Sequence, residues 1–201
     1  MKFKKTDLFL FTSNRYKLNE FKKIIPKNKF RLFYLNNFKK IKSPPETGKT
    51  FKKNAKIKSI YGYKISKMPS IGEDSGICID ALNGRPGTKS KRFLQLNGGH
   101  EKTNKKIIKM IEKRKKTGAT FHTVIALSFK NKTLYFCGKK RGKIVNKPLG
   151  NNGFHYDPIF KPIKSKKTYG QMKKSEKNRI SHRYLALKKL IGFLNKTNQF
   201  L

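Results

Sequence analysis

The sequence predicts an α/β protein. Short apolar runs of strand length alternate with longer segments in which apolar residues recur every three or four positions, as in amphipathic helices. Hydrophobic residues make up 35% of the chain and include 16 Phe, which favours a folded protein over a disordered basic one. A chain of 201 residues can form one large domain or two small lobes. Because no repeat or clean linker interrupts it, we expect a single domain over residues 1–201.

The N-terminal part shows the alternation most clearly. Leu8–Phe11 is predicted to be a buried strand, and Thr12–Asn14 a turn that caps the next helix, which ends at Pro26. The elements expected next are a strand at Arg31–Leu35, a loop at Ser43–Gly48, a helix of about 18 residues from Thr50, and strands at Ser70–Glu73 and Ile77–Asp80 around a Ser-Gly turn.

The C-terminal part begins with a loop at Asn83–Gly87. The elements expected after it are a lysine-rich helix over about 101–116, paired strands at Phe121–Phe129 and Thr133–Lys139 with Asn131-Lys132 at their turn, an irregular Gly-rich segment at Pro148–Asp157, and a final amphipathic helix marked by Ile180, Tyr184, Leu187, Ile191 and Leu194.

The chain is strongly basic, with 51 Lys and Arg against 10 Asp and Glu and a formal net charge of +41. Nucleic acid, nucleotides and anionic membranes are natural partners for such a charge. However, Lys greatly outnumbers Arg, and Asn, Ile and Phe are abundant, a composition that an A·T-rich coding sequence also produces. The charge therefore supports function and compositional drift equally, and the lack of an obvious concentration of Lys on one element counts against a nucleic-acid-binding module.

Cysteine usage and hydropathy indicate a cytoplasmic protein without a membrane segment. Cys78 and Cys137 lie in apolar strand-like stretches, which favours buried, reduced thiols. The basic N-terminus precedes only a short apolar run at Leu8–Phe11, whereas a signal peptide needs a core of ~7–15 residues. No run approaches the ~20 apolar residues of a membrane span.

The acidic residues are rare and clustered: three of the ten lie within Glu73–Asp80. Adjacent acids at the end of an apolar run suggest a metal or proton-transfer site at a strand end. Mg²⁺ prefers carboxylate oxygens and fills its other positions with waters and phosphate oxygens. Glu46, Glu73 and Asp74 are therefore the candidate ligands of a Mg²⁺ site. The alternative is that Asp74 caps a turn and Glu73 is exposed.

Two segments could bind phosphate. Thr12–Lys17 lies between a strand and a helix, where free N–H groups and the lysine attract anions. Lys58 lies on the small and apolar face of its helix, with Asn54 and Ala55, which suits a lysine that meets a buried anion. An ordinary helix cap and a snorkelling lysine are the corresponding alternatives.

A base-binding region is predicted nearer the C-terminus. Phe154 and Tyr156 could stack on a base, while Asp157, His182 and Arg183 could read its polar edge. A structural loop and a solvated helix end would explain the same residues.

Five motifs, in this order, resemble the inosine triphosphate pyrophosphatase family, the dITP/XTP pyrophosphatases that act on non-standard purine nucleoside triphosphates. The resemblance extends from Phe11 to Leu190. The motifs are Thr12–Lys17, Glu46–Gly48 with Asn54, Ala55 and Lys58, Glu73–Gly76 through Gly84–Gly87, Gly153–Pro158, and Glu176–Arg183.

The resemblance implies an elongated mixed sheet with flanking helices, arranged as two lobes around a central nucleotide cleft, and a homodimer. It also implies Mg²⁺-dependent cleavage of ITP, dITP or XTP to the monophosphate and pyrophosphate, with no membrane and no need for nucleic acid. The roles implied residue by residue are phosphate binding by Thr12, Ser13, Asn14, Arg15, Tyr16 and Lys17, metal binding by Glu46, Glu73 and Asp74, catalysis by Asp74 as base and Lys58 as charge stabiliser, and substrate binding by Ser75, Phe154, His155, Tyr156, Asp157, Lys177, His182 and Arg183.

Three residues depart from the family pattern: Ser13 and His155 stand where Gly is usual, and Glu73 where Asp is common. Of these, His155 bears most on base selectivity. Two other functions remain open: a basic nucleic-acid-binding module, and a related pyrophosphatase acting on other modified nucleotides.

Overall fold

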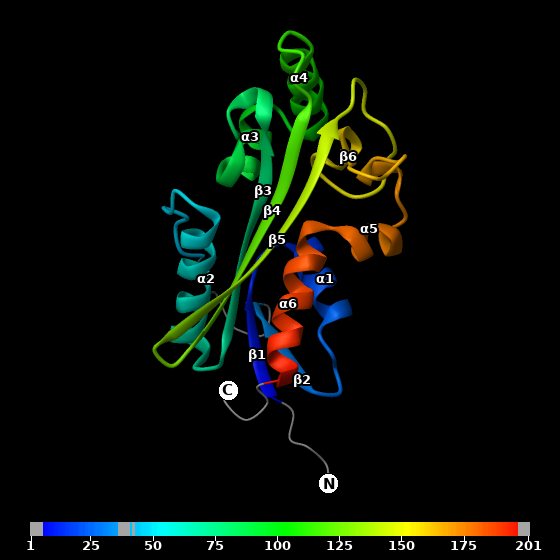
Figure 1. Cartoon of the computed structure of the whole chain (residues 1–201). Coiled ribbons are helices and arrows are strands. Elements are labelled where there is room, and N and C mark those ends of the chain that lie inside the picture. The colour runs from blue at the N-terminus through cyan, green and yellow to red at the C-terminus, as the bar shows by residue number, and fades with distance from the viewer. Residues whose placement is uncertain (1–5, 36–40, 42, 197–201) are drawn as a thin grey trace. The chain divides into compact units, whose positions relative to one another are not determined.

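The structure, a computed structural model that describes residues 6–35, 41 and 43–196, is built on a six-stranded sheet with strand order β2-β1-β3-β4-β5-β6 (Figure 1). The predicted α/β class is confirmed. In chain order the helices and strands are β1 (Thr6–Phe11), α1 (Arg15–Ile24), β2 (Phe30–Tyr34), α2 (Phe51–Ser66), β3 (Ser70–Ile79), α3 (Ser90–Leu96), α4 (His100–Glu112), β4 (Gly118–Phe129), β5 (Lys132–Ile144), β6 (Phe160–Pro162), α5 (Lys174–Ile180) and α6 (His182–Lys196). Short 3₁₀ turns are η2 (Asp80–Leu82), η3 (Gly87–Lys89), η4 (Asp157–Ile159) and η5 (Tyr169–Gln171).

The chain divides into two compact units. Unit 1 comprises the described parts of Met1–Asp74, Val124–Cys137 and Ala186–Leu201, and unit 2 comprises Ser75–Thr123 and Gly138–Leu185. Each unit has its own apolar core.

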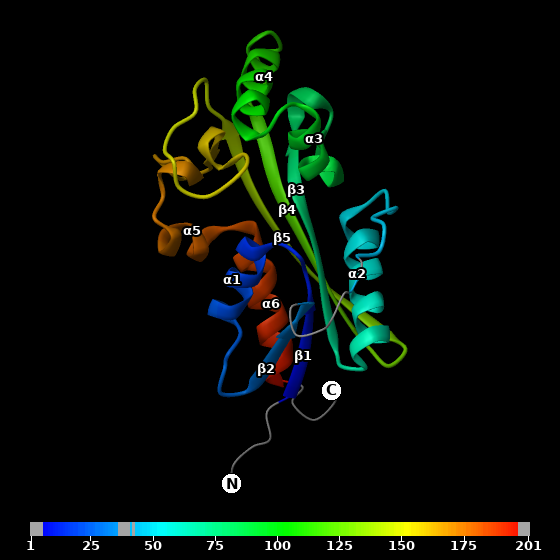
Figure 2. The same cartoon turned by 180° about the vertical axis from the view of Figure 1, so that it is seen from behind.

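In unit 1 the period-2 alternation of strand side chains builds two layers. Ile125 and Leu127 of β4 pack with side chains of α1 and α6, whereas Val124 and Ala126 pack with Ala55 of α2. Both views of the ribbon accordingly show α2 on one side of β1 and α1 with α6 on the other (Figures 1 and 2). The sheet is therefore covered by helices on both faces in this unit.

The carboxyl end of β1 is a point where the order of parallel strands reverses. β1 pairs in parallel with β2 on one side and with β3 on the other. Ligands of open α/β sheets bind outside the carboxyl ends of strands at such a point. The β1–β3 register ends with Phe11 opposite Gly72, so Glu73 and Asp74 are the next residues of β3. The segment that leaves β1 and the acidic pair thus meet at this place in unit 1.

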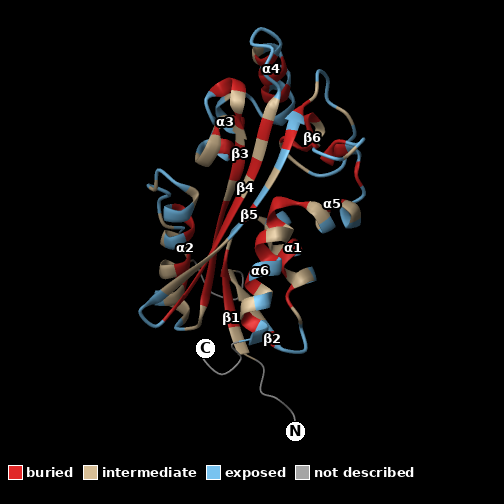
Figure 3. Ribbon diagram, in the orientation of Figure 1, coloured by how far each residue is buried: buried red, intermediate tan, exposed pale blue. Residues whose placement is uncertain are grey.

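The prediction of a Ser-Gly turn between two strands is wrong, because β3 is one continuous strand from Ser70 to Ile79. It lies between β1 and β4 in the sheet and is buried along most of its length (Figure 3). Pairing on both sides overrides the turn tendency of Ser75 and Gly76. The acidic pair therefore lies within a strand and not at its end.

The helices of the second half differ from prediction at their boundaries. The lysine-rich helix ends at Glu112 instead of about 116, before a basic run in which Lys115 has a φ of 49°. α3 was not predicted; Gly98 and Gly99, both with positive φ, separate it from α4. The final helix is split into α5 and α6 at Ser181, whose ψ of 154° is extended.

The strands β4 and β5 confirm the predicted pair, but their turn is Lys130-Asn131, one residue earlier than expected. Cys78 and Cys137 are both free thiols, as expected, yet Cys137 is exposed and Cys78 only half-buried. β5 pairs with β6 only over Gly142–Ile144, which leaves the stretch around Cys137 uncovered by that strand. Within the described ranges, no helix is long and apolar enough to cross a membrane.

Candidate active site

In unit 1, Asp74 of β3 meets two side chains of α2. Its carboxylate accepts a hydrogen bond from Asn54 Nδ2 at 3.1 Å, and Lys58 Nζ lies 3.6 Å from Asp74 Oδ1. The same ammonium group lies 2.8 Å from Glu46 Oε1 and donates to the main-chain oxygen of Glu73 at 3.2 Å. Asn54 and Lys58 are one turn apart and therefore leave α2 on the same face. The structure thus joins three of the predicted site residues, Glu46, Lys58 and Asp74.

The electrostatics of this group suit proton transfer. Burial raises the pKa of Asp74 to about 6, although Lys58 and Lys17 oppose the rise. A carboxylate with a pKa near neutrality can take up a proton at physiological pH, as a general base must. Burial lowers the pKa of Lys58, but the carboxylates of Asp74, Glu46 and Glu73 outweigh it and the pKa is raised. Lys58 is therefore a constant positive charge beside a titratable acid.

The turn after β1 confirms its role as a helix cap. The Asn14 side chain accepts hydrogen bonds from the N–H groups of Tyr16 and Lys17 at 2.9 and 3.1 Å, and so occupies two of the donors that the sequence offers to phosphate. The Lys17 ammonium forms an ion pair with the buried carboxylate of Glu73. Ser13, Arg15 and Tyr16 are exposed. In this structure Lys17 is thus the member of Thr12–Lys17 that reaches the acidic pair.

A glycine sets the distance between β3 and α2. A Cβ at Gly72 would lie 2.3 Å from the main-chain oxygen of Ala55 and 2.4 Å from the main-chain nitrogen of Ser59, closer than atoms can approach. Only glycine allows this contact, and the contact lets Asn54 and Lys58 reach Asp74. Neither Gly72 nor Asn54 is among the predicted site residues, although Asn54 belongs to the second motif and lies one turn before Lys58 on the same helix face.

The carboxylates fit a divalent cation only in company with a substrate. In the part of the chain that the structure describes, no three carboxylate, imidazole or thiol groups gather into a metal site. Mg²⁺ commonly takes one or two protein carboxylates and completes its shell with waters and substrate phosphates. Glu46 and Asp74 meet that requirement, because both carboxylates lie close to the same group, the Lys58 ammonium. Glu73 pairs with Lys17, and its place as a third ligand stays a prediction.

In unit 2 a second group of predicted residues gathers at the start of α6. Ser181 Oγ caps the helix by accepting a hydrogen bond from a first-turn N–H at 3.1 Å, which places His182 and Arg183 in that turn. Arg183 Nη2 donates to Ser75 Oγ at 3.1 Å. The His182 ring stacks on Phe121, with centroids 4.6 Å apart and planes 8° apart. Both polar side chains are thus held in fixed orientations.

A buried ion pair fixes the loop that carries Phe154. Lys177 Nζ lies 2.6 Å from Asp157 Oδ2, and the same oxygen accepts a hydrogen bond from the Phe154 N–H at 2.7 Å. Burial raises the pKa of Asp157, against the effects of Lys177, the Phe154 N–H and Arg183. Lys177 Nζ lies 4.7 Å from the centre of the Phe154 ring, and Arg183 Cζ lies 6.0 Å from it. Asp157 therefore orders the loop, and Phe154 keeps two cations against its ring.

Tyr156 is not a stacking surface, contrary to prediction. Its side chain is 2% exposed within the unit 2 core, and its hydroxyl donates to the main-chain oxygen of Ser90 at 2.7 Å. Burial accordingly raises the pKa of this phenol. A ring enclosed by protein on both faces cannot receive a base, so Phe154 is the remaining candidate for that role.

His155 has a φ of 59°, the left-handed region that favours glycine. This explains why Gly is usual at the position. Its main-chain oxygen accepts a hydrogen bond from Asn104 Nδ2 at 3.0 Å, and Asn104, His155 and Phe154 line a cavity of about 410 Å³ in unit 2. The buried Asn104 was not predicted, because its position on a lysine-rich helix carries no signal of burial.

The comparisons with known proteins agree with the motifs. The model of the Ham1 family matches residues 8–193 of this chain. The chain belongs to the Ham1 family. A dITP/XTP pyrophosphatase of Halalkalibacterium halodurans is 38% identical over 187 residues, which cover 92% of this chain and 96% of that protein. A dITP/XTP pyrophosphatase of Flavobacterium johnsoniae is 33% identical over 94% of this chain and 98% of its own length.

Solved structures of Ham1 proteins share the fold. The Ham1 protein of Coxiella burnetii superposes with a TM-score of 0.89 at 32% identity, covering 96% of this chain and all of that one. The Ham1 protein of Staphylococcus aureus gives a TM-score of 0.86 at 34% identity over 95% of this chain and 99% of its own. The resemblance to nucleotide pyrophosphatases inferred from the five motifs is therefore confirmed as family membership.

Proposed function

We propose that the chain hydrolyses the deaminated purine nucleoside triphosphates ITP, dITP and XTP to the monophosphate and pyrophosphate, and thereby cleanses the nucleotide pool. The carrying observation is the arrangement of Asp74, Lys58 and Glu46 in a chain of the Ham1 family. A titratable carboxylate beside a lysine of constant charge suits attack by water on a polyphosphate. Relatives named dITP/XTP pyrophosphatase support the substrate class.

The residues of unit 1 would act on the triphosphate. Water attacks the α-phosphorus, the bond from that phosphorus to the bridging oxygen breaks, and pyrophosphate leaves with the oxygen. Asp74 accepts the proton of the water, while Lys58 and Lys17 neutralise charge that grows on the phosphate oxygens. Asn54 orients Asp74 through its hydrogen bond.

The residues that would hold Mg²⁺ are Glu46 and Asp74, with Glu73 nearby. Once bound, the cation supplies positive charge that polarises phosphate oxygens and acidifies water. In this structure Lys17 pairs with Glu73, and Lys58 pairs with Glu46 and Asp74. We infer that the two lysines turn to the phosphates when substrate and metal enter together.

The residues of unit 2 would hold the base. Phe154 would stack on it, and His182 and Arg183 would donate to the 6-keto oxygen that hypoxanthine and xanthine share. Adenine presents a 6-amino group there, which would leave these donors unpaired, and such a mismatch can reject a substrate by ~10⁴–10⁵-fold. The hydrogen bond that Arg183 donates to Ser75 Oγ holds the guanidinium group in place. Guanine also has a 6-keto group, so its exclusion must involve the 2-position.

The test is pyrophosphate release from ITP, XTP, GTP and ATP, each with and without Mg²⁺, with dUTP and 5-methyl-UTP measured alongside. The measurement is made about two units above the pKa of Asp74, which is about 6, so that the carboxylate is ionised. We expect release from ITP and XTP only with Mg²⁺, and little from GTP or ATP. If dUTP or 5-methyl-UTP is cleaved instead, the alternative of a pyrophosphatase for other modified nucleotides replaces this proposal.

Variants test the assigned roles. Asp74→Asn should lower kcat/KM by about 10²–10⁴-fold, the usual contribution of a general base. Lys58→Ala should also lower kcat/KM steeply. Asp80→Asn is the matched control, because this acid pairs with Arg141 in unit 2 and touches none of the proposed catalytic groups. Activity of either site variant close to that of Asp80→Asn would disprove its role.

The remaining parts of the proposal concern assembly and location. The resemblance supports a homodimer, and sedimentation at micromolar concentration would contradict it by showing a monomer. The free thiols of Cys78 and Cys137 support a reducing compartment, and we propose the cytoplasm.

A further inference from the structure

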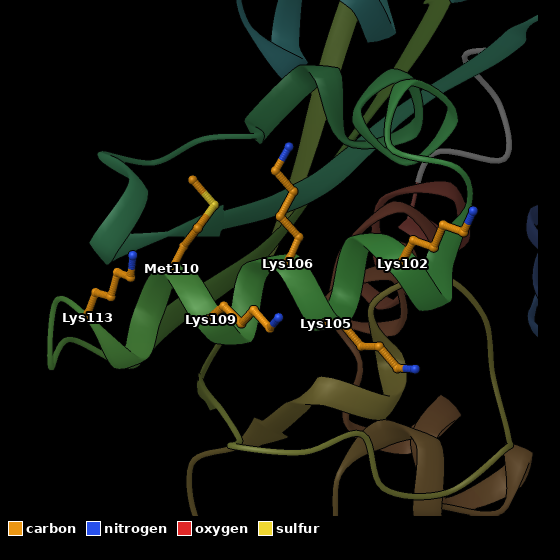
Figure 4. Close-up of a pocket in the computed structure, with 6 residues that line it drawn as sticks. All are labelled: Lys102, Lys105, Lys106, Lys109, Met110 and Lys113. Carbon is orange, nitrogen blue, oxygen red and sulfur yellow. The ribbon is translucent and has the colours of Figure 1, made fainter.

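The predicted lysine-rich helix, α4, and Lys113 directly after it carry a concentration of lysines, contrary to the expectation that no element would. Lys102, Lys105, Lys106, Lys109 and Lys113, named the α4 lysine face, line a shallow cavity of about 500 Å³ together with Met110. Figure 4 shows these side chains extending from α4, with Lys106, Met110 and Lys113 on one side. Four of the lysines fall at positions i, i+4, i+7 and i+11, which form a single stripe along a helix.

The charge of this face is left unneutralised by the protein. All five lysines are exposed, and across the described residues none of them forms an ion pair with a carboxylate. The two glutamates of α4, at its first turn and its last residue, leave an excess of positive charge. Arg114, Lys115 and Lys116 follow directly and are also exposed. A stripe of uncompensated ammonium groups is suited to a partner with regularly spaced negative charges.

The opposite side of α4 is packed in the protein core, which makes a membrane a poorer partner for this helix than a nucleic acid. Ile107, Ile108 and Ile111 are buried in the unit 2 core, so the helix has no apolar face to insert into lipid. Met110 is the one half-buried apolar side chain among the residues described around the cavity. Among the described residues, no aromatic side chain lines it, whereas proteins that bind single-stranded nucleic acid commonly stack bases on aromatic rings.

We propose that the α4 lysine face binds the phosphate backbone of a nucleic-acid duplex without reading its bases. From Lys102 to Lys113 the stripe extends about 16 Å at 1.5 Å per residue, a length over which a DNA duplex carries about ten phosphate charges. The duplex therefore carries more phosphate charges over this length than the four lysines of the stripe carry positive charges. The inference rests on charge and geometry, and is independent of the proposed catalytic activity.

The test is the salt dependence of binding to a fluorescently labelled DNA duplex, measured by anisotropy. The probe variant changes Lys102, Lys106, Lys109 and Lys113→Gln; Lys105 is kept because it also lines the cavity beside His155. The matched control makes the same change of charge at exposed lysines dispersed over α1, β5 and α6, namely Lys23, Lys139, Lys143 and Lys188→Gln. Gln preserves helix propensity, and circular dichroism checks that α4 remains folded.

Each phosphate contact contributes a slope of about −0.9 to log K against log salt. The probe variant should lose about 3–4 units of slope and bind at least about tenfold more weakly at 0.1 M salt, whereas the control should lose less than about one unit. Pyrophosphate release should be unchanged in both variants. Replacing the same four lysines with Arg should retain binding, because the charge is kept.

Three results would overturn the inference. Equal losses in the probe and control variants would show that net charge alone drives binding. Tighter binding of a single-stranded oligonucleotide through the same four lysines would contradict the duplex assignment. If the probe variant lost binding to phosphatidylserine vesicles but still bound the duplex, the α4 lysine face would be assigned to a membrane surface.

Discussion

His155 holds a backbone conformation that costs about 1–2 kcal/mol for a residue with a Cβ. His155→Gly removes that cost, but glycine loses more entropy on folding and the edge contact with the Phe154 ring disappears. We expect the free energy of unfolding to rise by about 0.5–1 kcal/mol, measured by denaturant titration. His155→Ala is the control, because it removes the ring and keeps the strain. If Ala stabilises as much as Gly, the imidazole and not the backbone is the source of the effect.

Lys177 neutralises a carboxylate that burial disfavours. Lys177→Met leaves Asp157 buried without its cation, so we expect a loss of about 3–5 kcal/mol at pH 8. The pKa of Asp157 is already raised, and it rises further in the variant. A raised pKa means that the ionised carboxylate opposes folding, so the deficit should shrink as the pH is lowered and Asp157 takes up a proton.

The control for this pair is the double variant Lys177→Met with Asp157→Asn. The amide that replaces the carboxylate is neutral and can still accept the hydrogen bond from the Phe154 N–H, so most of the stability should return. Thermal unfolding between pH 5 and pH 8 would measure both effects. A deficit that is independent of pH and persists in the double variant would assign Lys177 a packing role.

Single residues differed in how well their roles could be predicted. Asp74 and Glu46 stood out because acids are rare in this chain, and Lys58 because a lysine on an apolar helical face needs a partner. Tyr156 and Asp157 were assigned to a base because their residue types suit it, whereas the fold uses one in the core and the other as an anchor for a loop. Side-chain type alone does not show which polar atoms and ring faces are already in contact with other residues of the protein.

At the level of elements, the contact of β3 with α2 determines the geometry of the site. Gly72→Ala would force a Cβ against the backbone of α2. We expect a loss of about 2–3 kcal/mol in stability from overpacking. Displacement of Lys58 and Asn54 from Asp74 should lower kcat/KM by at least about tenfold, because small misplacements of catalytic groups reduce rates strongly.

Gly192 provides the matched control for Gly72. It lies within α6, and a Cβ there would meet no atom within 4 Å. Gly192→Ala should therefore raise stability by about 0.5–1 kcal/mol through helix propensity, with activity unchanged. If the two substitutions changed stability similarly, β3 and α2 would be able to move apart enough to accommodate a Cβ at position 72.

Local pattern predicted the elements that have their own signals, such as the cap at Asn14 and the stop at Pro26. It failed where neighbours in space decide. The Ser-Gly pair within β3 lies between two strands, and pairing with them keeps it extended. The break at Ser181 depends on a cap that no periodicity shows. α3 was missed because it is only seven residues long.

For the molecule as a whole, the order of motifs was more informative than composition. Five motifs identified the family from one end of the chain to the other, whereas the net charge of +41 left function and drift equally plausible. The spacing of Lys102, Lys106, Lys109 and Lys113 can be read from the sequence, and the structure adds that they line one cavity together with Lys105. The division into two units was expected from the family resemblance alone, because no linker marks it in the sequence.

The way the chain passes between the two units predicts how they unfold. The unit boundaries follow Asp74, Thr123, Cys137 and Leu185, and each lies within a regular element, β3, β4, β5 and α6 respectively. Neither unit is formed from one continuous segment. Unfolding one unit would thus fray strands and a helix on which the other depends. We propose that residues 1–201 behave as a single domain and unfold in one cooperative transition.

Calorimetry tests this, because a two-state transition has equal calorimetric and van't Hoff enthalpies. Gly72→Ala lies in unit 1 and Lys177→Met in unit 2, so together they probe both parts. Each should lower the temperature of the same single transition, since the free energy of the whole chain changes whichever unit is altered. Two resolved transitions, with each variant shifting only the one that belongs to its own unit, would show that the units fold independently.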